Sequence, residues 1–137
     1  MNIVDRSSGR VYQIKATSMT SLGIQYCQAD SSGNVIANSC GAAPVLPCTT
    51  NATSACPIVA NFNAKANIQD ITNPASPISI DGNATLQVSI TDRGEPGSSD
   101  TIGITLYDKS NTLWLSSNWN GVKTLEQLIG GGNLVAH

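Results

Sequence analysis

Residues 83–91 and 101–108 alternate between apolar and polar side chains with a period of two. Ala84, Leu86, Val88 and Ile90 are separated by Thr, Gln and Ser, and the same spacing returns at 102–106. Successive side chains of a β-strand point to opposite faces of the sheet, so this spacing gives one apolar face and one polar face. The pattern predicts half-buried strands, and helical periodicity is almost absent from the chain.

Turn-forming residues divide the remainder of the chain into further extended segments. Asp81 and Gly82 are expected to turn the chain between two of these segments, and residues 124–129 are expected to form one short helical turn. The set predicts an all-β fold, an antiparallel β-sandwich or flattened barrel of about eight to ten strands. The expected strands are residues 3–4, 11–16, 22–29, 34–38, 58–71, 78–80, 83–91, 101–108, 112–116 and 133–136.

Four cysteines lie close together, at positions 27, 40, 48 and 56. They are even in number and form no Cys-x-x-Cys pair, which favours disulfides over a zinc site. A two-residue turn at Gly33-Asn34, closed by Ser32 and Val35, would place Cys27 opposite Cys40 at a non-hydrogen-bonded position, where side chains approach most closely. Three pairings exist, and we favour Cys27 with Cys40 and Cys48 with Cys56.

Size and charge restrict the function classes. The 137 residues fit one domain, residues 1–137, and only 12% of them are charged, with a net charge of −2. A chain with no basic face is a poor partner for nucleic acid, and an apolar run of about 18 residues, which membrane insertion requires, is missing. A surface of Ser, Thr, Asn and Gln is typical of secreted β-proteins. The N-terminus lacks the features of a signal peptide, so we expect a domain excised from a larger exported protein.

The C-terminal half resembles a known group of proteins. The string Ser99 to Lys109, SDTIGITLYDK, and the terminal GGGNLVAH are similar to the end of β-rich accessory modules in bacterial secreted and cell-surface proteins. Those modules occur downstream of choice-of-anchor or immunoglobulin-like domains. The resemblance covers about residues 59–137, although Ile102 and Tyr107 stand where Phe and Trp are commoner. It implies a non-catalytic extracellular module with neighbouring domains and brings no catalytic residues.

An acidic loop is a candidate calcium site. Asp92, Glu95 and Asp100 lie within nine residues between two expected strands. Calcium takes six to eight oxygen ligands from loops of this kind. The alternative is an ordinary hairpin loop in which Arg93 pairs with Asp92 or Asp100. The spacing is not that of an EF-hand, and the sequence calls for no other cofactor.

Two tryptophans in a polar setting are candidates for ligand binding. Trp114 alternates with two leucines and is expected to face away from them, whereas Trp119 lies between Asn118 and Asn120. An aromatic ring covers the apolar face of a sugar while amides bond its hydroxyls. Tyr107 would extend such a surface. The alternative is that the tryptophans cover an open edge of the core.

The sequence leads to an expectation of a non-enzymatic module. It contains no nucleophile beside a base and no phosphate-binding loop, and its single histidine is the last residue. We expect adhesion or carbohydrate binding at the cell surface or outside the cell. The alternative is a structural stalk or self-assembling subunit whose neighbours meet at the strand edges of residues 3–4 and 133–136.

Overall fold

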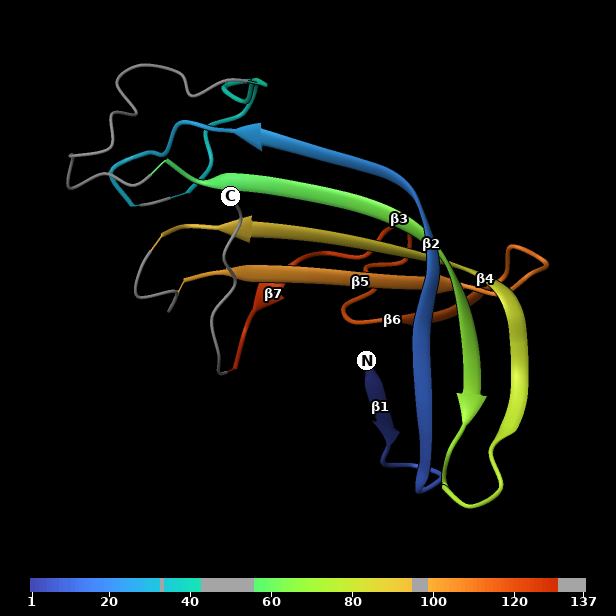
Figure 1. Cartoon of the computed structure of the whole chain (residues 1–137). Helices are drawn as coiled ribbons and strands as arrows, with labels where there is room; N and C mark the ends of the chain where they lie inside the picture. The colour runs from blue at the N-terminus through green and yellow to red at the C-terminus, as the bar shows by residue number, and fades with distance from the viewer. Residues whose placement is uncertain (33, 43–55, 95–98, 131–137) are drawn as a thin grey trace.

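A computed structural model describes residues 1–32, 34–42, 56–94 and 99–130. The described residues contain no helix, which confirms the all-β fold class. Neighbouring strands pair antiparallel in the order β1-β2-β3-β4-β5-β6, and β7 pairs with β5 beside β6 (Figure 1). The strands are β1 (Asn2–Asp5), β2 (Arg10–Tyr26), β3 (Ile58–Asp70), β4 (Ile78–Asp92), β5 (Thr101–Tyr107), β6 (Leu113–Ser116) and β7 (Gln127–Leu128).

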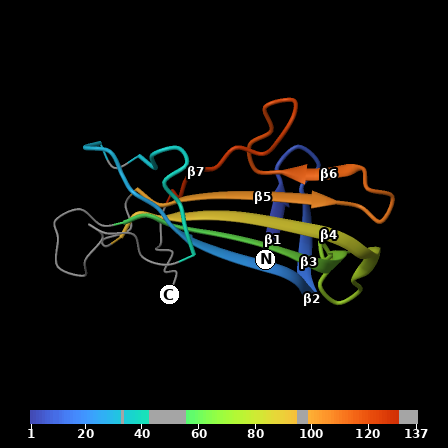
Figure 2. The same ribbon diagram turned by 90° about the horizontal axis from the view of Figure 1, so that it is seen from above.

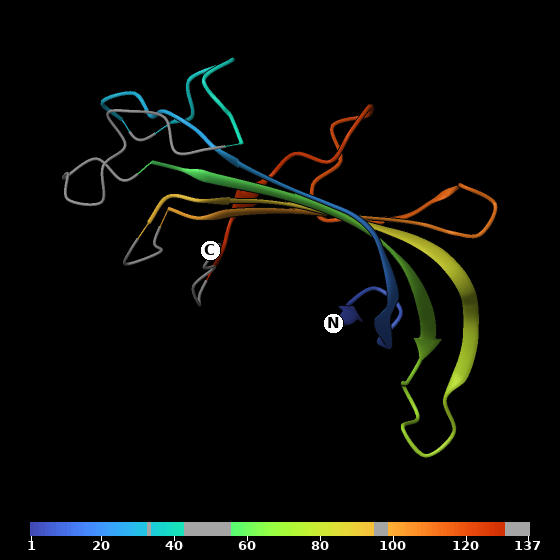
Figure 3. The same ribbon diagram turned by 45° about the horizontal axis from the view of Figure 1, so that its top comes forward.

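The described strands form one seven-stranded sheet rather than two facing sheets. The sheet curls into a half-barrel, so the flattened barrel is the better of the two predicted architectures (Figures 1 and 3). Its long strands β2, β3 and β4 bend together, and β1 lies inside the bend, close to β6 (Figure 2). The sheet therefore has a concave face and a convex face.

Bulges produce the bend. The pairing of β2 with β3 shifts register between Ala16 and Ser18 and again between Met19 and Ser21. A bulge inserts an extra residue into one strand, bends it and increases its twist. The sequence pattern has a gap between residues 16 and 22, which predicts two separate strands, residues 11–16 and 22–29. The gap marks the bulges, and β2 continues through it as one strand of 17 residues.

The prediction of a turn at Asp81-Gly82 is wrong, again because a bulge lies where the sequence pattern is interrupted. Strand β4 runs without interruption from Ile78 to Asp92, and its register against β3 shifts beside Ile68, which pairs with Asp81. The Asp81 carboxylate accepts the backbone N–H of Asn83 at 2.8 Å and that of Lys109 at 2.8 Å. Asp81 therefore stabilises a bulge inside a strand and links it to the turn after β5.

The hydrophobic core lies on the concave face. Its buried members come from the even-numbered positions of β2 to β5, as the period of two predicts. Tyr12 of β2 and Trp114 of β6 meet in an edge-to-face contact with ring centroids 5.1 Å apart. This contact joins β2 to β6, which lie near the two ends of the strand order, across the concave side. The buried core comprises Ile14, Ala66, Ile68, Ala84, Leu86, Val88 and Leu106.

The disulfide between Cys27 and Cys40 is confirmed, with the sulfurs 1.99 Å apart. The local hairpin differs from the expectation, because Val35 pairs with Ala29 and not with Ser32, the predicted closing residue. Asn38 has a φ of 60°, in the left-handed region, and lies in a second turn between Val35 and Gly41. This turn takes up extra residues on one side of the hairpin, so that Gly41 pairs with Tyr26. The predicted hairpin of residues 22–29 and 34–38 is thus reduced to isolated bridges. Gly33 and Cys48 lie outside the described residues.

Two expectations near the C-terminus have different outcomes. Residues 124–129 form no helical turn; Thr124 bridges to Trp119, and Gln127–Leu128 is the short strand β7 on β5. The expected edge strand at residues 133–136 lies outside the described residues. Between β5 and β6 the chain turns at Lys109-Ser110-Asn111, with Asp108 accepting the backbone N–H groups of Ser110 and Thr112.

Candidate functional site

A shallow groove of about 300 Å³ lies on the convex, polar face of the sheet. Its floor consists of odd-numbered residues of β3, β4 and β5, which alternate with the core positions. This volume is at the lower end of the range for small-ligand sites. The polar side chains that line it are Asn61, Asn63, Gln87, Ser89, Thr105, Tyr107, Lys123 and Thr124.

Strand register places the groove residues in rows. Asn61 pairs with Ser89 and Ser89 with Gly103, while Asn63 pairs with Gln87 and Gln87 with Thr105. Neighbouring strands lie about 4.8 Å apart, so each row spans about 10 Å across the sheet. Two rows of amide and hydroxyl groups therefore form a flat polar floor, which Tyr107 borders at the far end of β5.

A small hairpin forms one wall of the groove. Residues 118–125 fold back over β5: the N–H of Leu125 donates to the carbonyl of Asn118, and Trp119 bridges to Thr124. Thr124 Oγ1 lies 2.5 Å from Thr105 Oγ1 and 2.7 Å from Ser116 Oγ. These hydroxyl contacts hold the hairpin on the polar face, and Figure 3 shows the segment between β6 and β7 rising from the convex side. Lys123, next to the anchoring threonine, lines the groove.

Close approach at Gly103 allows this arrangement. A Cβ at this position would lie 2.8 Å from Ser89 Oγ and 3.4 Å from Glu126 Cγ. The Glu126 Oε2 atom accepts the hydroxyls of Thr91 at 2.7 Å and Thr101 at 2.6 Å. A side chain at this position would force Ser89 Oγ to move, so glycine leaves room for Ser89 and Glu126 as they stand. Gly103 thus keeps one end of the groove open.

The structure separates the aromatic residues that the sequence grouped together. Tyr107 lines the polar groove, on the face opposite the buried Leu106. Trp114 packs against the core, and so does its neighbour Leu115. The expectation that Trp114 faces away from both leucines is wrong for Leu115. The β5–β6 pairing shifts register between Leu106 and Tyr107, and Trp114 and Leu115 both pack against the core. Trp114 covers an open edge of the core.

The remaining candidates lie in the hairpin wall. Trp119 is 39% exposed. It pairs with Thr124, which lines the groove, but does not line the groove itself. The side-chain oxygen of Asn120 accepts the N–H groups of Val122 and Lys123, and so shapes the tip of the hairpin. Asn118 contributes its backbone carbonyl to the hairpin. The asparagines around Trp119 therefore build the turn that presents Lys123.

The acidic loop uses two of its three carboxylates to bind backbone. Asp92 accepts the N–H of Gly94 at 2.8 Å, and the fully buried Asp100 accepts the N–H of Arg93 at 2.9 Å. Glu95 lies outside the described residues. Within residues 1–32, 34–42, 56–94 and 99–130, no three Asp, Glu, His or Cys side chains cluster as metal ligands would. The calcium site stays a prediction.

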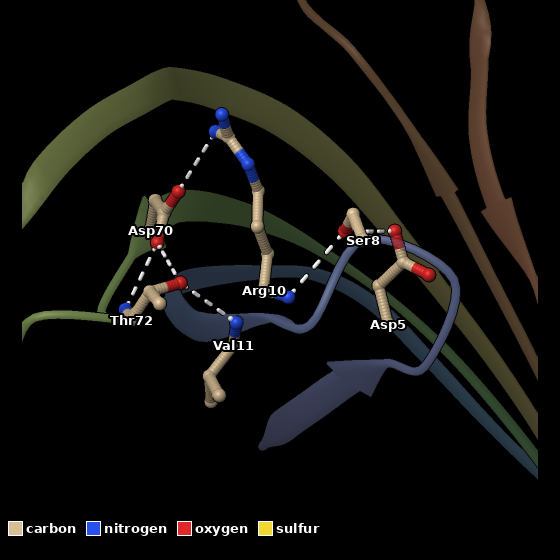
Figure 4. Close-up of polar contacts among 6 residues, drawn as sticks. All are labelled: Asp5, Ser8, Arg10, Val11, Asp70 and Thr72. Carbon is tan, nitrogen blue, oxygen red and sulfur yellow. Dashed lines mark hydrogen bonds and ion pairs between the residues drawn. The ribbon is translucent and has the colours of Figure 1, made fainter.

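Every aspartate of the chain accepts a backbone N–H at a turn, a bulge or a loop. Asp5 binds the N–H of Ser7, and Asp30 binds those of Ser32 and Asn34. Asp70 accepts both the N–H and the hydroxyl of Thr72 and pairs with Arg10 at 3.0 Å (Figure 4). Asp81, Asp92, Asp100 and Asp108 act in the same way. The aspartate side chains therefore lie at turns, loops and bulges, and none of them lines the groove.

These hydrogen bonds favour the ionised carboxylates. The hydroxyls of Ser8 and Ser7 lower the pKa of Asp5 to about 2. Hydrogen bonds from Thr72, followed in size by the charge of Arg10, lower the pKa of Asp70. The backbone N–H groups of Asn83 and Lys109 lower the pKa of Asp81. All three groups are accordingly charged at neutral pH.

Sequence reasoning missed the floor of the groove and the role of the aspartates. The signal for the floor was the run of amides at alternate positions of residues 61–67, opposite the alanines. The signal for the capping was the recurring Asp-x-Ser, Asp-x-Thr, Asp-x-Asn and Asp-x-Gly spacing, because Asp side chains commonly bond the backbone two residues on. Neither signal indicates which strands lie next to one another.

Comparison with models of protein families, with curated proteins and with solved structures gave no significant match. Among the described residues no helix is both long and apolar enough to cross a membrane. The Cys27–Cys40 disulfide is typical of proteins that fold in an oxidising compartment.

Proposed function

We propose that this chain is a non-catalytic accessory module of an exported bacterial protein, and that it binds carbohydrate in the groove on its convex face. The observation that carries the proposal is the composition of that groove: two rows of amides and hydroxyls beside the ring of Tyr107. Amides bond sugar hydroxyls in both directions, and an aromatic ring covers the apolar face of a pyranose.

Binding without hydrolysis agrees with the side chains present. Most glycosidases need two carboxyl groups on either side of the bond they cleave. The described residues that line the groove include no Asp, Glu, His or Cys. The resemblance of residues 59–137 to accessory modules of surface proteins and the Cys27–Cys40 disulfide both support an extracellular or cell-surface location.

A glycan array followed by calorimetry tests this proposal. We expect binding to a subset of glycans and a loss of affinity of about tenfold or more for Tyr107→Ala, with much of it retained in Tyr107→Phe, which keeps the ring. Asn61→Ala should weaken binding, whereas Asn67→Ala, on the same face of β3 but outside the groove, should not. An array without any hit, or equal affinity for both asparagine variants, would contradict it.

Strand edges favour self-assembly as a second candidate function. Strands β1 and β6 end the strand order, and the residues described here contain no further strand beyond either. A groove of about 660 Å³ between them is lined by Ile3, Val4, Tyr12 and Trp114, and Val4 is 62% exposed. An open strand edge can pair with another chain. Light scattering at increasing protein concentration separates the two functions. Self-assembly predicts a molar mass that rises with concentration, and Val4→Lys should reduce that rise.

A further inference from the structure

The groove carries positive charge in a chain whose net charge is negative. Lys123 lines it from the hairpin wall, and among the described residues Lys123 takes part in no ion pair. Lys65 stands on the same face of β3, directly beyond Asn63, and its Nζ atom donates to Thr85 Oγ1 at 3.3 Å. In register, Lys65 pairs with Thr85 and Thr85 with Tyr107, so the lysine and the aromatic ring belong to one row.

A carboxylate beside the groove, that of Glu126, already has hydrogen-bond partners. Glu126 lies beside Gly103, and its Oε2 atom already accepts two threonine hydroxyls. One of these threonines, Thr101, also accepts a hydrogen bond from the Arg93 guanidinium at 3.0 Å. The aspartates bind backbone at turns, bulges and loops. Two lysine ammonium groups thus flank a floor whose lining residues carry no carboxylate.

We propose that the ligand of this groove is an acidic glycan, one whose sugar units carry carboxylate or sulfate groups. The inference rests on the proposed carbohydrate binding and adds its charge specificity. The amide rows recognise hydroxyls, and the lysines supply charge-assisted hydrogen bonds to the anionic groups, which are stronger than neutral ones. Lys65 stands on β3 and Lys123 on the hairpin over β5, so successive anionic units of a chain that crosses the floor would meet both.

Matched pairs of glycans provide the test. Polygalacturonate and its fully methyl-esterified form share a backbone and differ in carboxylate charge; dextran sulfate and dextran make the corresponding pair for sulfate. We expect the intact protein to bind at least one acidic member about tenfold more tightly than its neutral counterpart. Raising the salt concentration should weaken acidic binding only, because mobile ions screen exposed charges.

Charge-removing variants locate the effect. Lys123→Gln and Lys65→Gln should each lower affinity for the acidic glycan by about threefold to tenfold, and should lower affinity for its neutral counterpart by a smaller factor. Arg6→Gln is the control, because Arg6 carries the same charge but lines the groove on the opposite, concave face. Melting curves of all three variants verify that they fold.

The outcomes distinguish the two proposals. Equal affinity for acidic and neutral glycans, with a loss in Tyr107→Ala, would overturn the charge specificity and keep carbohydrate binding. Acidic binding that falls equally in Arg6→Gln and Lys123→Gln would mean attraction by overall charge, and would also overturn the inference. Failure of every glycan to bind would overturn both proposals.

Discussion

The two faces of this sheet come from the same strands but differ in what their side chains do. On the concave face, even-numbered residues such as Ile68 and Leu106 are fully buried and hold the strands together. On the convex face, odd-numbered neighbours such as Asn61 and Gln87 stay exposed and line a groove. Because burial and exposure alternate along one backbone, stability and ligand binding should respond to different substitutions, even at adjacent positions.

Adjacent residues Leu106 and Tyr107 give the sharpest comparison of the two faces. Leu106→Ala should lower the free energy of unfolding by about 2–5 kcal/mol, because it leaves a cavity in the core. Tyr107→Ala, one residue further on, should change stability much less and remove most glycan affinity. Urea unfolding and calorimetry measure both quantities. Similar stability losses in the two variants would contradict the separation of the faces.

The two tryptophans extend the comparison to the sheet edges. Trp114 packs edge to face on Tyr12 and covers the core, so Trp114→Ala should cost about 2–4 kcal/mol of stability. Trp119 is 39% exposed in the hairpin wall, and Trp119→Ala should cost about 1 kcal/mol or less. Its main effect should be a several-fold weaker affinity through displacement of Lys123. Thermal melts monitored by far-UV circular dichroism test the order.

The aspartates that accept backbone N–H groups at turns and bulges should make the stability of the fold sensitive to acid. This effect comes from neither the core nor the groove. The folded-state pKa of Asp5 is about 2, below its ordinary value of 3.8, and the pKa values of Asp70 and Asp81 are also lowered. Their stabilising effect is therefore complete above about pH 4 and declines as the pH falls toward 2. Unfolding measured from pH 6 to pH 2 should show this loss. Asp81→Asn, which keeps an acceptor but does not titrate, should reduce the slope.

Gly103→Ala gives the smallest expected effect and tests the shape of the groove. The added methyl group would lie 2.8 Å from Ser89 Oγ, so the serine side chain must move. We expect a stability change within about 1 kcal/mol and a modest loss of glycan affinity, because one end of the polar floor narrows. A chemical-shift change confined to residues near Ser89 and Glu126 would confirm the local nature of the change. Unchanged affinity would place the ligand elsewhere on the face.

The sequence predicted the elements whose signal is local. Alternation along residues 58–71 and 101–108 gave β3 and β5 with the correct inward faces, and cysteine spacing gave the Cys27–Cys40 bridge. Period-two patterns specify the face of a residue regardless of its partners, which explains this success. Turn residues were less reliable, since Asp81-Gly82 also suits a bulge.

The site depended on features that no local pattern contains. The expected ligand surface combined Trp114, Trp119 and Tyr107 because they are near in sequence, yet a register shift between β5 and β6 turns Trp114 to the core. The groove floor needs β3, β4 and β5 side by side in a particular register. Register follows from the packing of the whole sheet, so neighbouring amides from three strands could not be recognised in advance.

Mapping the ligand on the folded protein tests the central claim most directly. An acidic oligosaccharide that binds in the glycan experiments is titrated into isotope-labelled protein while backbone and side-chain amide signals are recorded. The account predicts saturable shifts for the side-chain amides of Asn61, Asn63 and Gln87 and for backbone signals of Tyr107 and Lys123. Shifts confined to the concave face, around Ile3, Tyr12 and Trp114, would contradict it.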